Sequence, residues 1–290
     1  MTSDRPFGRE SIIPYNYRRA TYRAGIAVSS VIIAIFAIFP MYWIAQNAFK
    51  TRSAINDSIT FLPTPSTFTF ARFEVVLSSR VLNYIINSLI VTAGTIVLVV
   101  LVSLLAGYGL ARFEFRGKSY FARVLLFGYM FAPIVLALPL YLIWNRLGLL
   151  NTYLGLIFAL SALTLPFTVW LMWKFMQSIP KSLEESAWIQ GAPRWRGFID
   201  IVLPQAKPAL IANALFAFAI AWNDFTFAQI LLPREEATTF PPGVLRLLNS
   251  QWETGYGDFM AAALLMIIPP LLFAYFLQSY LLQGFEVRSI

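Results

Sequence analysis

The apolar stretches of this chain limit its fold most strongly, because several are long enough to cross a lipid bilayer. A helix needs about 20 residues to cross about 30 Å of hydrocarbon. Five uncharged runs reach that length: Ile26–Ala45, Tyr84–Ala111, Val124–Asn145, Leu147–Trp173 and Phe259–Phe285. A sixth run, Pro208–Pro233, carries one charge, Asp224. Since backbone groups cannot stay unpaired in lipid, the pattern predicts an all-α membrane protein with six transmembrane helices.

The six runs also define the expected domain organisation. We expect an N-terminal segment over residues 1–25, a transmembrane domain over 26–285 that includes a long loop over 177–206, and a short tail over 286–290. The first run exceeds the apolar core of a signal peptide, which has about 7–15 residues. We therefore predict that it is retained as the first span.

Composition excludes several kinds of chemistry. Hydrophobic residues make up 58% of the chain and charged residues only 12%, whereas soluble proteins have about 25% charged residues. The chain has no Cys and no His. Thiolate catalysis, imidazole acid–base catalysis and the usual zinc or copper ligand sets are therefore excluded. We predict no catalytic residue and no metal site in this chain.

The distribution of positive charge predicts the orientation in the membrane. A net charge of +8 could suggest a nucleic-acid partner. With both termini placed in the cytoplasm, however, 15 of the 22 Lys and Arg residues lie on the inner side and 7 on the outer side. An excess of Lys and Arg in cytoplasmic segments is typical of membrane proteins. The charge therefore indicates membrane orientation, and we expect no nucleic-acid partner.

The inner loop before the fifth run contains the signals of a short capped helix. Ser182 is followed three residues later by Glu185, a spacing that indicates a capping box at a helix start. Gly191 suits the left-handed position that ends a helix, and Pro193 blocks its continuation. We predict a helix of about two turns here, and a second short helix over Arg194–Leu203 that leads to Pro204 and the fifth span.

Several motifs together resemble the permease subunits of ATP-binding-cassette importers. Their cytoplasmic signature, E-A-A-x-x-x-G ending in I-x-L-P, is similar to Glu185-Ser186-Ala187 with Gly191-Ala192 and Ile201-Val202-Leu203-Pro204. Ser186 and Gln190 replace the usual Ala and Asp. Further segments resemble the sugar-importer branch, in particular its shorter, six-span maltose-type partner. They are Asn87-Ser88-Leu89, the run from Tyr108 to Gly117, Ala221-Trp222-Asn223-Asp224 and Gly257-Asp258-Phe259-Met260-Ala261-Ala262.

The resemblance implies the type I importer permease fold with a cytoplasmic coupling helix, in a bacterial or archaeal inner membrane. It also implies a function: the chain forms a solute pathway with a second, similar permease, driven by two copies of a cytoplasmic ATPase. ATP and Mg would be bound by those ATPase subunits, and this chain would need no cofactor. An extracytoplasmic solute-binding protein would deliver an oligosaccharide or a related polyol.

The resemblance also implies which residues couple the chain to the ATPase: Glu185, Ser186, Ala187, Gly191 and Ala192. Small side chains at 186 and 187 would let the helix sit close in a groove of its partner. Two interpretations of Glu185 remain open, since the carboxylate could cap its own helix or pair with the ATPase.

Asn223 and Asp224 are candidate pathway residues. An acidic residue within an apolar run often faces a water-filled path or the protein interior. Asp224 could equally lie at the outer interface beside Trp222, as part of an aromatic belt. Both interpretations remain open at this stage.

Two other functional classes fit the sequence less well. A secondary transporter would need acidic residues in the middle of its spans, and Asp224 is the one acidic residue in the apolar runs. A membrane-embedded enzyme would need paired carboxylates or a Ser–Lys pair, and the runs contain neither. Gly117-Lys118-Ser119 resembles the end of a phosphate-binding loop, but that motif requires Gly at position 112, which is Arg.

Overall fold

The computed structural model of the chain describes residues 15–57, 61–78, 80–130, 132–250 and 255–286. All regular elements within these residues are helices, which confirms the all-α prediction. Most of the predicted N-terminal segment, and all of the predicted tail after Glu286, lie outside the described residues. Among the described residues, five helices are long and apolar enough to cross a membrane: Tyr22–Ala48, Val81–Arg112, Tyr153–Ser178, Arg194–Trp222 and Tyr256–Phe276.

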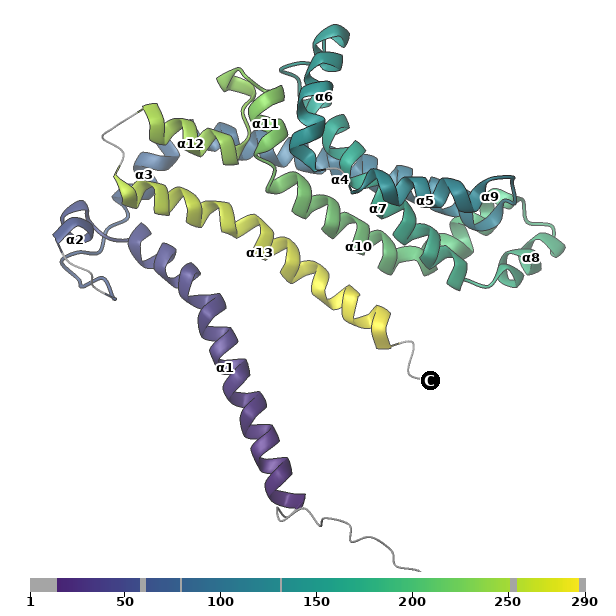
Figure 1. Ribbon diagram of the computed structural model, residues 1–290, viewed down its shortest axis with the longest axis horizontal. Helices are drawn as coiled ribbons and strands as arrows, with labels where there is room; N and C mark the ends of the chain where they lie inside the picture. The colour runs from purple at the N-terminus through teal and green to yellow at the C-terminus, as the bar shows by residue number, and fades with distance from the viewer. Residues whose placement is uncertain (1–14, 58–60, 79, 131, 251–254, 287–290) are drawn as a thin grey trace, which may run out of the picture.

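Figure 1 shows the arrangement of the helices, in which α4, α7, α10 and α13 form an elongated bundle and α1 diverges from it. The elements in chain order are α1 (Tyr15–Ala48), α2 (Arg52–Asp57), α3 (Ala71–Ser78), α4 (Val81–Arg112), α5 (Lys118–Gly128), α6 (Pro133–Leu147), α7 (Tyr153–Ser178), α8 (Lys181–Ile189), α9 (Arg194–Arg196), the π-helix η1 (Gly197–Val202), α10 (Leu203–Trp222), α11 (Thr226–Leu231), the 3-10 helix η2 (Glu235–Ala237), α12 (Phe240–Ser250) and α13 (Tyr256–Glu286).

Two glycines let α4 and α7 pack closely. A Cβ atom at Gly94 would lie 2.5 Å from Cδ1 of Ile157, and one at Gly107 would lie 2.6 Å from Cγ of Met172. Both distances are too short for non-bonded carbons. Because lipid provides no hydrophobic drive between helices, small residues at the contact are a main way for membrane helices to associate. The two glycines therefore set the separation of α4 and α7.

A buried amide joins α10 to these two helices. Nδ2 of Asn213 donates to Oγ of Ser103 on α4 at 2.9 Å and to the backbone oxygen of Thr168 on α7 at 3.1 Å. Asn213 is fully buried. A polar side chain in this setting needs its partners nearby, so it helps to hold α4, α7 and α10 in one register.

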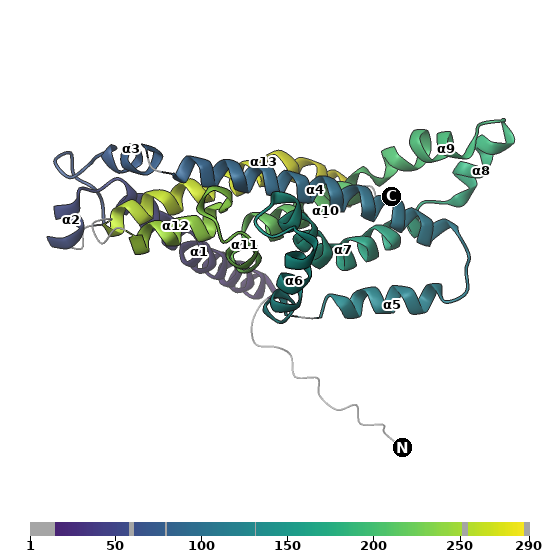
Figure 2. The same ribbon diagram turned by 90° about the horizontal axis from the view of Figure 1, so that it is seen from above.

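The third predicted span is not one helix, which corrects the prediction for Val124–Asn145. The run is divided between α5, which ends at Gly128, and α6, which begins at Pro133. Proline disfavours helix in the residue before it and suits the first turn of a new helix. Ala132 accordingly adopts an extended conformation with ψ of 132°. Figure 2 shows that α5 and α6 run in different directions.

The fifth predicted span is also shifted. Its helix begins in the inner loop at Arg194, passes through α9 and η1, and ends with α10 at Trp222. The predicted separate helix over Arg194–Leu203 is therefore continuous with the span. The wide π turn lies just before Pro204, which has no N–H to donate. The outer part of the predicted run forms the separate helix α11.

The first span stands largely apart from the bundle. Its apolar side chains are exposed in all directions, with Phe36 83% exposed. The helix contacts α13 near its C-terminal end (Figure 1), and Asn47 and Ala48 at that end are buried. A helix that is apolar all round fits a lipid environment.

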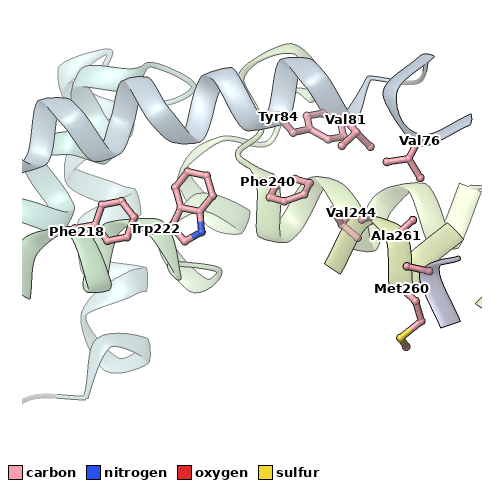
Figure 3. Packing of buried hydrophobic residues seen from close by; sticks show 11 residues of the cluster. Val76, Val81, Tyr84, Phe218, Trp222, Phe240, Val244, Met260 and Ala261 are labelled. Atoms are coloured by element: carbon pink, nitrogen blue, oxygen red, sulfur yellow. The ribbon is translucent and has the colours of Figure 1, made fainter. Parts of the chain in front are cut away.

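Aromatic residues build the core between α4, α10, α12 and α13. Figure 3 shows Phe218 and Trp222 of α10 in this cluster, together with Tyr84 and Phe240. The indole N–H of Trp222 donates to the backbone oxygen of Met266 at 3.1 Å. The Phe218 ring stacks on that of Phe273, with centroids 4.1 Å apart. These contacts fix the C-terminal half of α10 against α13.

The close contact at Gly107 generates a prediction. Gly107→Ala should lower the stability of the protein in detergent by about 1–3 kcal/mol, because the added methyl overpacks the contact with Met172. Gly109→Ala is the matched control, since its nearest neighbour would lie 4.0 Å away. Thermal unfolding of the purified proteins measures both effects. Equal stability of the two variants would contradict the close packing of α4 and α7.

Candidate functional site

The predicted inner helix exists, but it starts differently from the prediction. Helix α8 begins at Lys181, and its N-cap position is Pro180, with no side-chain cap hydrogen bond. The predicted capping box of Ser182 and Glu185 is therefore wrong. Ser182 lies inside the first turn, where its backbone oxygen accepts a hydrogen bond from Oγ of Ser186 at 2.8 Å. Because Pro180 has no N–H and suits the extended backbone that precedes a helix, it can start α8 without a polar cap.

The end of α8 agrees with the sequence. Gly191 adopts φ of +88°, the left-handed conformation that was predicted. The N–H of Gly191 donates to the oxygen of Trp188 at 3.0 Å, and the N–H of Ala192 donates to the oxygen of Ala187 at 3.0 Å. This pair of hydrogen bonds is the Schellman motif, which satisfies the last carbonyls of a helix. A side chain at position 191 would be strained by roughly 1–2 kcal/mol.

One face of α8 is exposed. Ser182, Glu185, Ser186 and Ile189 follow the three- and four-residue spacing of a single helix face, and all four are exposed. Ile189 is 87% exposed, and Trp195 in the following segment is also exposed. Among the other predicted coupling residues, Gly191 is exposed, and Ala187 and Ala192 are half-buried. Ile189, the last residue of α8, is the apolar member of this otherwise polar face.

The opposite face of α8 carries a residue that the sequence analysis missed. Glu184 is 1% exposed, and its Oε1 lies 2.5 Å from Nε of Arg112, which is 8% exposed. Oε2 of Glu184 accepts a hydrogen bond from the hydroxyl of Tyr108 at 2.8 Å. Tyr108 and Arg112 are four residues apart on α4 and therefore share a face. Both residues belong to the family-like run from Tyr108 to Gly117, and their four-residue spacing was the sequence signal for a shared partner.

Arg112 also connects α8 to α7. Its Nη1 donates to the backbone oxygen of Met176 at 3.2 Å, and its Nη2 donates to that of Ile179 at 3.3 Å. Both carbonyls lie at the C-terminal end of α7, where helix carbonyls run out of intrahelical donors; the Met176 oxygen also accepts from the backbone N–H of Ile179 at 3.3 Å. One guanidinium therefore joins the ends of α4 and α7 to the buried face of α8.

Aromatic contacts hold the rest of the loop against this ion pair. A Cβ atom at Gly197 would lie 2.9 Å from Nε1 of Trp188, so the indole of α8 packs directly on η1. The guanidinium of Arg194 lies 5.6 Å from the Trp188 ring. The ring of Phe198 packs edge-on against that of Tyr108, with centroids 4.7 Å apart. The loop is thus a folded unit at the end of the bundle where α4 and α7 finish (Figure 2).

Asn223 and Asp224, the two candidate pathway residues, lie just after α10, at the opposite end of that helix from this loop. Asp224 accepts hydrogen bonds from the backbone N–H groups of Phe227 at 3.3 Å and Ala228 at 2.8 Å. Its carboxylate therefore caps α11 and is not in the middle of a span. Asn223, just after α10, is exposed, and its Nδ2 donates to the oxygen of Ala219 at 2.9 Å. A pathway role for either residue stays a prediction.

The Asn87-Ser88 motif organises the outer end of α4. Nδ2 of Asn87 donates to the backbone oxygens of Glu236 and Thr238, and its Oδ1 accepts from the hydroxyl of Tyr153 at 2.7 Å. Oγ of Ser88 accepts from the backbone N–H of Phe240 at 2.8 Å. These contacts fix the segment that leads into α12. Asn87 and Ser88 thus have a structural role, because their side chains hold neighbouring backbone in place.

The described residues offer no arrangement for metal binding, since they contain no group of three or more His, Cys, Asp or Glu side chains that could hold an ion. Gly117 has φ of +90° before α5, but it follows helix α4 and not a strand. A phosphate-binding loop requires a preceding strand.

The Glu184–Arg112 pair generates a prediction. Glu184→Ala should lower the stability of the protein by about 3–5 kcal/mol, because it leaves the Arg112 guanidinium buried and unpaired. Glu185→Ala is the control one residue away. It should change stability by no more than about 0.5 kcal/mol, since Glu185 is exposed. Thermal unfolding in detergent provides the measurement, and similar losses in both variants would refute the anchoring role of Glu184.

Comparisons with known proteins give three related findings. The family model described as "Binding-protein-dependent transport system inner membrane component" matches residues 100–287. The chain is 34% identical over 252 residues to the probable ABC transporter permease protein YurM of Bacillus subtilis, covering 87% of this chain and 83% of that protein. It is 32% identical over 271 residues to the trehalose/maltose transport system permease protein MalG of Thermococcus litoralis, covering 91% and 95%.

A solved structure has the same fold. It is the crystal structure of a bacterial ABC transporter involved in the import of the acidic polysaccharide alginate. One of its chains matches with a TM-score of 0.75 and 23% identity, covering 93% of this chain and 99% of that chain. The fold resemblance supports the permease architecture expected from the sequence. Given the extent of the family match, this chain belongs to the inner membrane components of binding-protein-dependent transport systems.

Proposed function

We propose that this chain is the permease subunit of a sugar importer, in which α8 couples a cytoplasmic ATPase to the transmembrane helices. Family membership already makes the chain a multi-pass permease component of an ATP-driven, binding-protein-dependent system, and not an enzyme. ATP binding in such a system belongs to a partner subunit. The proposal adds the substrate class, the partners and the residues that carry the coupling.

The names of the relatives support a sugar as the solute. Besides the trehalose/maltose permease of Thermococcus litoralis, they include a trehalose permease of Mycobacterium tuberculosis and a diacetylchitobiose permease of Streptomyces coelicolor. All three are named for disaccharides. We infer that this chain transports an oligosaccharide, which an external binding protein delivers. The pathway would lie between this chain and a second, similar permease, and α1 would contact lipid.

The geometry of the inner loop carries the coupling proposal. Helix α8 presents one face to solvent, while its other face is tied to α4 and α7 through Glu184 and Arg112. A partner that binds the exposed face would therefore act directly on two spans. We assign that face, with Glu185, Ser186 and Ile189, to an ATPase groove, one on each of two ATPase subunits for the two permeases. In this proposal Gly191 and Ala192 end the helix and hold its orientation.

An ion-coupled secondary transporter fits the geometry less well. Such a protein would need an ionisable group in the middle of a span. Asp224 lies after α10, and its carboxylate accepts hydrogen bonds from two backbone N–H groups of α11. The secondary-transporter alternative would also give the exposed face of α8 no function.

Bulk on the exposed face of α8 should separate ATP hydrolysis from transport. Ser186→Trp should abolish uptake and binding-protein-stimulated ATPase activity in the reconstituted complex, because overpacking a fitted contact costs about 1–3 kcal/mol. Ser178→Trp is the control, since Ser178 is an exposed serine at the end of α7, outside α8. Normal uptake by an assembled Ser186→Trp complex would remove this face from the coupling site.

Orientation forms a separate prediction, in which both termini and the inner loop are cytoplasmic. The chain has no Cys, so single cysteines report their own accessibility. In whole cells, Ser66→Cys should react with an impermeant maleimide and Ser182→Cys should react only after the membrane is permeabilised. The reverse labelling pattern would overturn the orientation.

A further inference from the structure

The break in the third membrane run lies against the middle of α7. Helix α5 ends at Gly128 and α6 begins at Pro133. A Cβ atom at Gly128 would lie 3.8 Å from Cγ of Pro166, which is near the midpoint of α7. Non-helical backbone at membrane depth is tolerated where it is buried in protein or lines a water-filled cavity. Broken helices of this kind often border the solute sites of transporters.

Three aromatic rings from three segments gather at this break. The Tyr129 ring lies 5.7 Å from the ring of Phe167 on α7 and 6.3 Å from that of Phe216 on α10, centroid to centroid. Phe167 and Phe216 are 4.5 Å apart. Tyr129 is 46% exposed and the two phenylalanines are half-buried. Within the described residues, the Tyr129 hydroxyl has no hydrogen-bond partner, so it is available to a ligand.

An open strip on α10 continues outward from these rings. Ala219 and Asn223 follow Phe216 by three and seven residues, which places all three on one helix face. Ala219 and Asn223 are exposed, whereas Asn213 and Ala217 on the other face are fully buried. The strip therefore leads from the aromatic cluster to a side-chain amide at the outer end of the helix.

We propose that Tyr129, Phe167, Phe216 and Asn223 form a contact surface for a neutral sugar in this subunit. A pyranose ring presents C–H groups on one face, which pack on aromatic rings, and hydroxyls at its edge, which suit the Tyr129 hydroxyl and the Asn223 amide. Ligand sites combine an apolar, aromatic lining with a few placed polar groups in this way. The inference rests on the proposed function, because it assumes that the solute is a sugar.

The charge of the surface narrows the substrate class. None of the four side chains is ionised at neutral pH, and the adjacent Asp224 is occupied by two backbone N–H groups. An acidic polysaccharide would require positive side chains to replace its hydration. The surface therefore favours a neutral oligosaccharide over an acidic one such as alginate.

The test measures sugar transported per ATP hydrolysed by the complete complex in proteoliposomes, with radiolabelled maltose, trehalose, diacetylchitobiose and an alginate oligosaccharide. Phe167→Leu and Phe216→Leu keep apolar bulk but remove the rings. Each should lower the ratio at least about fivefold, in line with the strength of ring stacking, while stimulated ATPase activity stays near wild type. Tyr129→Phe, which keeps the ring but removes the hydroxyl, should lower the ratio by less than either ring deletion.

The control is Phe158→Leu, because Phe158 is nine residues from Phe167 on α7, faces the opposite side and is 43% exposed. It should behave as wild type. A wild-type ratio in both ring-deletion variants, or equal losses in the control, would overturn the sugar surface and indicate simple packing or lipid contact.

Failure of the proposed function would look different. A wild-type complex that hydrolyses ATP but takes up none of the four sugars would refute the sugar substrate, and the contact surface with it, before any variant is made. Loss of ATPase stimulation would indicate a defect at the coupling face of α8 and not at this surface.

A second readout is labelling of Ala219→Cys by a small impermeant thiol reagent from outside, which a transported sugar should slow. Labelling that sugar leaves unchanged would count against the surface.

Discussion

Hydrocarbon offers no hydrogen bonds, so every interruption of a helix within the membrane must find partners in the protein itself. This constraint accounts for the two places where the apolar runs break. After α10, the carboxylate of Asp224 accepts two backbone N–H groups of α11. Before α6, Pro133 removes one donor that would otherwise be unpaired. Breaks that satisfy the constraint are where a membrane protein can expose backbone and side chains to a solute.

The unbroken helices provide the rigid part of the molecule. Glycines bring α4 and α7 together, and Asn213 ties α10 to both. A buried ion pair such as Glu184–Arg112 contributes little net stability, because desolvation of the charges offsets their attraction. Its effect is on geometry, since the guanidinium also binds the end of α7. The pair therefore fixes the position of α8 relative to α4 and α7.

Much of this arrangement could be read from the sequence, and the exceptions have physical causes. Hydropathy located the membrane segments, because length and polarity decide membrane crossing, and Gly191 marked the end of α8. Periodicity could not show that Pro133 would divide the third run, since proline also occurs within the membrane helices α7 and α13. The capping box was misassigned because Pro180 starts the helix without a polar cap. Glu184 was missed because its partners are 72 and 76 residues away in sequence.

Glu184 and Glu185 illustrate why helix phase matters at this site. Successive residues on a helix point about 100° apart, so one carboxylate faces Arg112 while its neighbour faces solvent. The two ends of α8 hold that phase, Pro180 at the start and the left-handed Gly191 at the finish. A slip of one residue would bury Glu185 in place of Glu184, so the two ends of the helix decide which carboxylate pairs with Arg112. Pro180, Gly191 and the buried pair together thus determine which face of α8 is exposed.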